Sequence, residues 1–319
     1  MMSLVKNEWM KIFSKVSTYI FIAFLLLAAL GAAVIDYKLS PDETNKDWKQ
    51  ELNADIQEQE KALEAKEISE EEKAAIMEEI TYNKQLLADN INPDLNTNWT
   101  YMAEWTTSLT SFVTLFVVIV CSSLVSSEFS DGTIKQLLIR PYKRWKILLS
   151  KYITSLLFAA LLLASLLIFS YLIGIIFFGN GSYSDKIMDP ASFGEFSPVV
   201  VGEYFVDMIV YWIPGFLVIT TIAFMLSTLF KNQALAVGIS IFILFASSTL
   251  NMVIQSFIGK YEWLKFVLFP HLDLRGYISG TIEMFDGATL GFSMGVLGIY
   301  YFIFLVLTFF FFQKKDITN

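Results

Sequence analysis

The sequence is poor in the side chains that build metal sites and disulfides. Its 319 residues include one cysteine, Cys121, and one histidine, His271. A single cysteine can form neither an internal disulfide nor a cysteine metal site within one chain. His271 and Asp273 would supply only two ligands, fewer than a zinc site requires, so we expect a structural or interfacial role for them. The sequence therefore predicts no metal site and no cofactor-binding residue.

Motifs for catalysis are absent as well. The chain contains no phosphate-binding G-x-x-x-x-G-K-[ST], no zinc-binding H-E-x-x-H and no G-x-S-x-G. A membrane-embedded enzyme would have His271 as its only candidate base, so we predict no catalytic residue. The net charge of −8 argues against a nucleic-acid partner. If the protein moves a solute, the free energy must come from another subunit.

Charged residues are scarce, at 17% of the chain against about 25% in a soluble domain, whereas 55% are hydrophobic. A membrane-spanning helix needs about 20 mostly apolar residues, and six stretches qualify. None contains Asp, Glu, Lys or Arg, so the intramembrane carboxylates that ion-coupled transporters use are missing. We expect an all-α integral membrane protein with six transmembrane helices, the first an uncleaved signal anchor. The approximate bounds are Val16–Ile35, Thr106–Ser126, Tyr152–Phe178, Met208–Leu229, Gln233–Ile258 and Thr289–Phe312.

The remaining charges are segregated by side. With the N-terminus inside, the short inner segments hold 12 basic residues and four acids, and six of these basic residues lie in the loop 127–151. The outer segments 179–207 and 259–288 hold four basic residues and nine acids. Because Lys and Arg accumulate in cytoplasmic loops, the sequence predicts that both termini are cytoplasmic.

Residues 36–105 form the one long aqueous segment, with 18 acids and seven basic residues. The stretch is rich in helix formers, and Ser69 with Glu72 fits a capping box that starts a second helix. We therefore expect an extracellular helical hairpin. Two interpretations remain open: a solvated acidic spacer, or a lid or receptor that contacts cationic substrates.

Two further segments are amphipathic but do not span. Residues 3–15 predict an N-terminal helix that lies in the inner interface before the first span. Residues 259–288, with several aromatics and glycines, predict an outer re-entrant segment before the last span. The expected organisation is therefore an interfacial helix and first span over 1–35, the acidic hairpin over 36–105, and spans two to six over 106–319.

The spans also contain uncharged polar residues and one proline. Such groups either hydrogen-bond neighbouring helices or face a cavity, and Pro214 followed by Gly215 predicts a kink. Both readings, a translocation pathway or span packing, remain open for Pro214, Thr220, Thr221, Ser247, Ser248, Asn251 and Gln255.

The basic loop 127–151 carries more than charge. Gly132 gives the backbone freedom for a turn, an apolar helical stretch follows, and Pro141 ends it. We expect this loop to be a docking site for another protein. Its predicted contact residues are Glu128, Phe129, Asp131, Gly132, Thr133, Lys135, Leu137, Leu138, Pro141 and Arg144.

These residues resemble a family, the membrane subunits of ABC-2 type ABC exporters. The shared pattern is E-x-x-x-G-T, a short apolar helix, a proline, a basic residue and a lysine at the next span, here Lys151. Six spans, the interfacial helix, the re-entrant segment and the run FPHLDLRGYISG at 269–280 extend the similarity over essentially the whole chain. The acidic hairpin is larger than the outer loop common in that family, so its role is not carried over.

The resemblance implies a permease subunit in a bacterial cell membrane. A coupling helix over 128–140 would sit in a groove of a separate cytoplasmic ATPase subunit, which would bind ATP and Mg²⁺. A second copy, or a homologous permease, would complete the pathway within the lipid. The cargo would be hydrophobic or amphipathic, such as an antimicrobial peptide, a drug or a lipid-like molecule. The alternative is a receptor whose acidic hairpin senses cationic peptides and signals through the basic loop.

Overall fold

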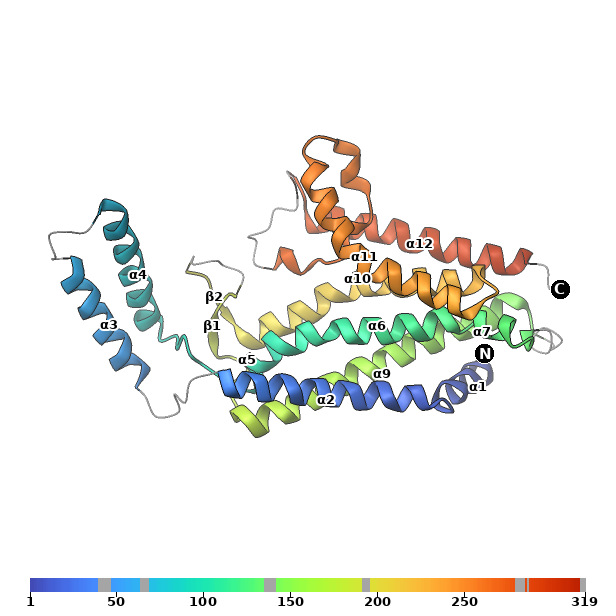
Figure 1. Cartoon of the computed structure of the whole chain (residues 1–319), viewed down its shortest axis with the longest axis horizontal. Coiled ribbons are helices and arrows are strands. Elements are labelled where there is room, and N and C mark those ends of the chain that lie inside the picture. Colours follow the sequence, from blue (N-terminus) through green and yellow to red (C-terminus); the bar gives the residue numbers. More distant parts are fainter. Residues whose placement is uncertain are drawn as a thin grey trace. The chain divides into compact units, whose positions relative to one another are not determined.

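The computed structural model describes residues 1–39, 47–63, 69–134, 142–190, 196–278, 285 and 287–315. Its elements are shown in Figure 1. In chain order, the first half contains α1 (Met2–Phe13), α2 (Val16–Leu39), α3 (Trp48–Leu63), α4 (Glu70–Asp89), α5 (Asn98–Tyr101), the π-helical turn η1 (Met102–Thr106), α6 (Thr107–Ser123) and α7 (Ser126–Ser130). The second half contains α9 (Arg144–Phe178), β1 (Lys186–Met188), β2 (Pro198–Val200), α10 (Val201–Leu229), α11 (Gln233–Ile258), the 3-10 turns η2 (Glu262–Phe266), η3 (Phe269–His271) and η4 (Arg275–Tyr277), and α12 (Leu290–Lys314).

The predicted all-α class and the six spans are confirmed. Among the described residues, six helical stretches are long and apolar enough to cross a membrane. Several extend beyond the predicted bounds, because the helices continue through polar residues that a hydropathy count leaves out. Their bounds are Val16–Leu39, Asn98–Ser130, Arg144–Phe178, Val201–Leu229, Gln233–Ile258 and Leu290–Lys314.

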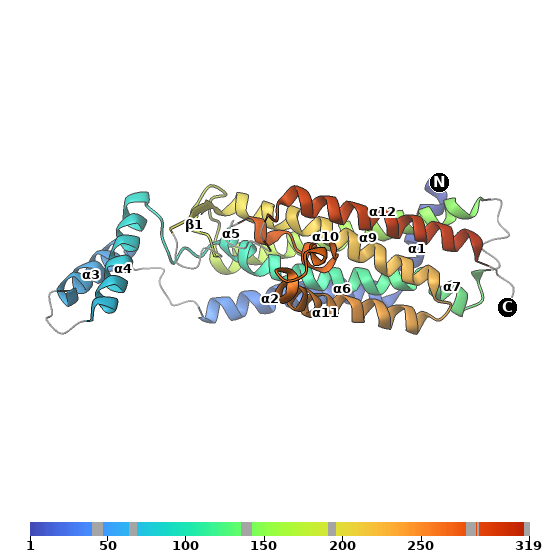
Figure 2. The same ribbon diagram turned by 90° about the horizontal axis from the view of Figure 1, so that it is seen from above.

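The chain forms two compact units. The first comprises Met1–Ala29, Thr106–Ser170 and Asp207–Asn319, and the second comprises Leu30–Trp105 and Tyr171–Val206. In the first unit, α6, α10 and α12 run in the same general direction (Figure 2).

The second unit contains the predicted helical hairpin. Helices α3 and α4 pack together around a small core of Leu52, Leu86 and Ile91. The capping box is confirmed, since the Glu72 N–H donates to Ser69 Oγ and the Glu72 carboxylate accepts from the Ser69 N–H. The antiparallel pair β1–β2 was not predicted, and the three-residue strands are too short to give a clear alternation in sequence.

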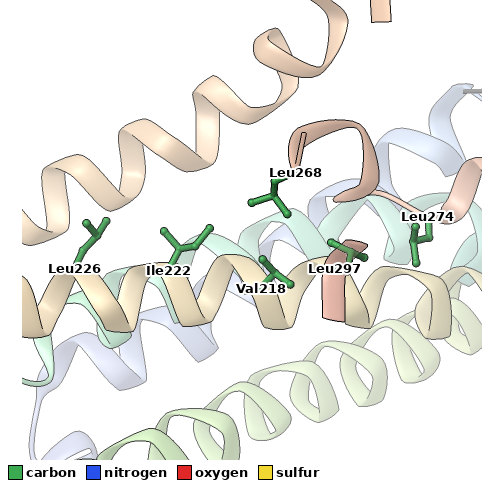
Figure 3. Packing of buried hydrophobic residues seen from close by; sticks show 6 residues of the cluster. All are labelled: Val218, Ile222, Leu226, Leu268, Leu274 and Leu297. Atoms are coloured by element: carbon green, nitrogen blue, oxygen red, sulfur yellow. The ribbon is translucent and has the colours of Figure 1, made fainter. Parts of the chain in front are cut away.

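The core of the first unit joins the re-entrant segment to the spans. Leu268 and Leu274, which lie on either side of η3, pack on α10 and on Leu297 of α12 (Figure 3). The α10 members of this cluster are Val218, Ile222 and Leu226. The segment between α11 and α12 therefore folds back into the bundle.

The buried side chain of His271 joins this segment to α12. The buried ring lies between Ser293 Oγ of α12, 2.7 Å from Nδ1, and the Lys265 carbonyl oxygen, 2.9 Å from Nε2. The Tyr277 hydroxyl is 2.8 Å from the same Ser293 Oγ. Burial lowers the pKa of His271, although the Lys265 carbonyl opposes the shift. The neutral imidazole thus holds η3 against α12 and the Lys265 carbonyl through hydrogen bonds.

Gly215 marks the closest approach of η3 to α10. A Cβ atom at this position would overlap the backbone carbonyl of Leu272. Pro214 lies inside α10, which continues as one helix to Leu229. The glycine is therefore needed for contact with the re-entrant segment.

We predict that Gly215→Ala lowers the free energy of unfolding by roughly 1–3 kcal/mol, the usual cost of overpacking. The sole cysteine, Cys121, is fully buried, so its reaction with a thiol-reactive dye on heating in detergent reports unfolding. The control is Gly238→Ala on α11, where an added Cβ meets no atom within 4 Å. Its melting temperature should stay equal or rise, and equal melting of both variants would contradict the close approach.

Candidate functional site

Four charged side chains meet where the interfacial helix, the basic loop and the third span come together. Lys151 Nζ donates to Glu8 Oε2 at 2.7 Å, to Glu128 Oε1 at 2.7 Å and to the Leu124 carbonyl at 3.2 Å. Lys11 Nζ donates to Glu8 Oε1 at 3.0 Å and to Glu128 Oε1 at 2.8 Å. We call Glu8, Lys11, Glu128 and Lys151 the four-charge cluster.

Three elements position this cluster. Helix α1 buries the stripe Leu4, Glu8 and Ile12, which recurs every four residues and so lies on one helix face. Glu128 lies in the single turn of α7. Lys151 lies two turns into α9, where its ammonium group reaches back to both carboxylates. Elements far apart in the chain are thus joined at one point.

The cluster is buried and balanced. The side chains of Lys151, Glu8 and Glu128 are 1%, 6% and 10% exposed, while Lys11 is 50% exposed. Taking charges out of water costs several kcal/mol per ion, and only close pairing and hydrogen bonding offset this cost. Two ammonium groups facing two carboxylates leave no formal net charge. Removing one buried member would leave its partners uncompensated.

The pKa values on α1 reflect this pairing. Burial alone would raise the pKa of the Glu8 carboxyl, but Lys151 and then Lys11 outweigh it, so the pKa lies below its ordinary value. Burial alone would lower the pKa of Lys11, but Glu128 and Glu8 outweigh it, so the pKa lies above its ordinary value. Both groups are charged at neutral pH.

Other contacts fasten the same end of the bundle. Ser130 Oγ donates to the Lys231 carbonyl at 3.0 Å and accepts from the Gln233 N–H at 3.0 Å, which ties α7 to the turn between α10 and α11. Arg144 Nη1 donates to the carbonyls of Gln313 and Lys315, at 3.2 and 3.4 Å. These bonds join α9 to the end of α12.

The ammonium group of Lys315 contacts α10 and Phe129 at this end of the bundle. Its ammonium group donates to the last carbonyls of α10, Thr228 at 2.6 Å and Leu229 at 3.0 Å, and lies 4.3 Å from the Phe129 ring centroid. Burial, with help from Lys231, lowers the pKa of Lys315 to about 8. A cation at this position complements the negative end of the helix dipole of α10.

The structure brings some of the predicted loop residues into this network and leaves others outside it. Glu128, Phe129 and Arg144 make the contacts above. The exposed Thr133 donates from its hydroxyl to the Glu128 carbonyl oxygen at 3.4 Å. Asp131 and Gly132 are exposed, and Gly132 has φ +70, the left-handed conformation that favours glycine. Four predicted residues, Lys135, Leu137, Leu138 and Pro141, lie outside the described residues, as does the C-terminal part of the predicted coupling helix, residues 135–140.

The polar residues of the spans separate into two groups. Ser247, Ser248 and Asn251 line a cavity between α6, α10, α11 and the η3–η4 segment. Thr220 and Thr221 are buried in α10, and the Thr221 hydroxyl is 2.8 Å from the Tyr152 hydroxyl.

Pro214 and Gln255 are the remaining two residues predicted for the pathway or for span packing. Pro214 lies inside α10, next to Gly215. Gln255 is exposed on α11. Neither lines the cavity.

Sequence reasoning missed Glu8 and Lys11 as site residues, and it named Lys151 only as part of the family pattern. A usable signal existed for Glu8, which lies four residues from both Leu4 and Ile12, on the face that becomes buried. An acid on an apolar helix face requires a buried cation. The pairing with Lys151 is 143 positions away along the chain, so no local pattern identifies the partner.

Comparison with known proteins adds a family and two relatives. The model of the family described as "Protein of unknown function (DUF2705)" matches residues 74–318. The chain is 39% identical to "Uncharacterized protein YhcI" of Bacillus subtilis (strain 168) over 332 aligned residues, which cover 100% of both chains. It is 30% identical over 227 residues to "Uncharacterized membrane protein YdbK" of the same organism, covering 71% of this chain and 87% of that protein. With its six candidate spans, the chain is a multi-pass membrane protein.

We predict that Lys151→Met lowers the free energy of unfolding by about 3–5 kcal/mol, because it leaves two buried carboxylates without their shared cation. The matched control, Lys11→Met, removes a half-exposed lysine from the same cluster and should cost about 1 kcal/mol or less. Thermal melting followed by tryptophan fluorescence measures both. Equal losses would contradict the buried position of Lys151.

The pH dependence of stability should also differ between the wild-type protein and Lys151→Met. The lowered pKa of Glu8 contributes stability that is present above its ordinary value of 4.5 and is lost as the pH falls through the lower folded value. In Lys151→Met the buried Glu8 carboxylate loses its main counter-ion and favours its neutral form, so that variant should gain stability between pH 7 and pH 5. The wild-type protein should not, and a parallel response of the two proteins would contradict the pairing.

Proposed function

The chain belongs to the family described as Protein of unknown function (DUF2705), and from this premise we propose that it is the membrane subunit of an ATP-driven ABC-2 type exporter. It forms the pathway through the bilayer, and a separate cytoplasmic ATPase subunit binds ATP and Mg²⁺. The observation that carries the proposal is the four-charge cluster, because it joins the interfacial helix, the start of the basic loop and the third span at one point. A displacement of the loop would act on all three.

The contacts of α9 extend this connection into the bundle. Lys151 is followed by Tyr152, whose hydroxyl lies 2.8 Å from Thr221 Oγ1 of α10 and donates to Tyr301 Oη of α12 at 3.0 Å. A shift of α9 that follows Glu128 would therefore disturb polar contacts with two further spans. Packed interfaces of this kind switch between discrete arrangements more readily than they deform. This supports a mechanical role for the loop.

The charge distribution indicates on which side of the membrane the cluster lies. Because the loop and both termini carry most of the inner basic residues, we place the cluster on the cytoplasmic side of a bacterial cell membrane. The sequence has no nucleotide-binding motif, so the subunit depends on its partner for energy. Helix α11 exposes Phe242, Phe245 and Met252, a surface suited to lipid or to a second permease. Two copies, or one copy with a homologous permease, complete the pathway.

A receptor for cationic peptides remains the second candidate, since the acidic hairpin α3–α4 is an ordered element that packs around a small hydrophobic core. A receptor needs the hairpin and not the ATPase. An exporter needs the ATPase and the loop. The spans of the exporter, poor in charge, suit hydrophobic or amphipathic cargo.

We predict that Gly132→Val reduces ATP-driven export about tenfold. The φ of +70 at Gly132 disfavours a β-branched residue by about 1–2 kcal/mol, which corresponds to roughly a factor of ten. The measurement is ATP-dependent uptake of a fluorescent apolar peptide into inverted vesicles that contain the chain and its proposed ABC ATPase partner. The matched control is Gly179→Val, with φ +79 and equally open surroundings, after the other end of α9.

Full uptake by Gly132→Val, or uptake that persists without any ATPase, would contradict the proposed coupling. A peptide response that survives removal of the ATPase but disappears on deletion of residues 45–90 would support the receptor instead.

A further inference from the structure

A cavity in the first unit is the strongest unassigned feature of the chain. Its volume is about 290 Å³, and it lies between α6, α10, α11 and the turns η3 and η4. Binding pockets for small molecules range from about 300 to 1,000 Å³, so this space suits one segment of a larger molecule. Part of its lining is polar and part is aromatic, so a bound molecule would take one orientation.

The polar wall offers hydrogen-bond acceptors. Asn251 Oδ1 is buried and has no hydrogen-bond partner among the described residues. The hydroxyl groups of Thr114, Ser247 and Ser248 already donate to carbonyl oxygens of their own helices, at 3.1, 2.6 and 3.1 Å. Their remaining lone pairs can only accept. A molecule that bonds to these four oxygens must bring donors.

Another part of the lining is apolar. Trp212 and Phe216 of α10 stack with their ring centroids 4.4 Å apart, and Phe269 and Leu272 of the re-entrant segment complete the lining. Aromatic rings bury a large apolar area and accept flat or branched apolar groups. The cavity is therefore amphipathic, with donors required at one part of the lining and apolar bulk at another.

The charges at the cavity cancel. Asp273 Oδ1 accepts from Arg275 Nε at 2.8 Å, and Oδ2 accepts from Nη2 in a bidentate pair. Arg275 Nη1 also donates to the Thr107 carbonyl at 3.4 Å. Because each charge has its counter-ion within the wall, the cavity offers no unpaired charge to an ionic ligand.

We propose that this cavity binds an uncharged amphipathic segment that presents hydrogen-bond donors beside an apolar body. Amide N–H groups of an apolar peptide and hydroxyl groups of a lipid-like alcohol share this chemistry. The inference rests on the proposed export function, because it names the part of the cargo that the pathway recognises. Asn251 is the specificity-determining residue, and Trp212 and Phe216 hold the apolar body.

The test uses the purified full-length chain in nanodiscs without any ATPase. Binding of dansyl-labelled Leu-Leu-Leu-amide is compared with its fully N-methylated form, which lacks the backbone donors, by fluorescence anisotropy. A dansyl-linked fatty alcohol and its methyl ether form the second arm. The donor-bearing member of a pair should bind about five- to tenfold more tightly, the value of one neutral hydrogen bond. The arm that shows this preference identifies the source of the donors.

Asn251→Leu should abolish the preference within the responding pair. The matched control is Gln255→Leu, which makes the same change of amide to leucine one turn later on α11, at an exposed position outside the cavity. It should keep the preference. The comparison of the two probes on the wild-type chain needs no variant, so it stays decisive if Asn251→Leu does not fold.

Several results would overturn the inference. They are equal binding within both pairs, tighter binding of a peptide that ends in a free carboxylate or amine, or an undiminished preference in Asn251→Leu. Failure of the export proposal gives a different pattern. Donor-selective binding would persist in the purified chain, while ATP-dependent uptake into vesicles would be absent.

Discussion

The junction of α1, α7 and α9 depends on one lysine that lies between two carboxylates. Lys151 is almost fully buried and donates to both Glu8 and Glu128. Buried charges are tolerated only when paired, so the position of α1 and the start of the loop are set by the third span. The same pairing stabilises the fold and makes the loop a place where an external displacement could act on several helices.

The distribution of polar groups over the first unit follows from this arrangement. Four paired charges lie where α1, α7 and α9 meet, hydroxyls such as Tyr152 and Thr221 join the spans next to them, and the cavity lies where the re-entrant segment folds back on α10. Gly215 permits that return by leaving room for the Leu272 carbonyl. A pathway that opens and closes would have to break or shift these polar contacts.

Much of the fold could be predicted because its signals are local. The six spans follow from apolar length, and the start of α4 follows from Ser69 and Glu72. The partner of Glu8 could not be predicted, because the pair joins α1 to α9 and arises only when the helices pack. The cavity at Asn251 could be proposed only as one of two readings, since a polar residue in a span either packs or faces a void. Both depend on tertiary contacts that no short window of sequence contains.

The central claim is that the cluster transmits the state of an ATPase through paired charges. Removal of the pair that joins α1 to α9 tests it most directly, because Glu8→Gln and Lys151→Met together leave Glu128 paired with Lys11 and no member of the cluster uncompensated. The double variant should melt closer to the wild-type protein than Lys151→Met does, yet its ATP-driven uptake into vesicles should be lost. Wild-type uptake in the folded double variant would contradict the account.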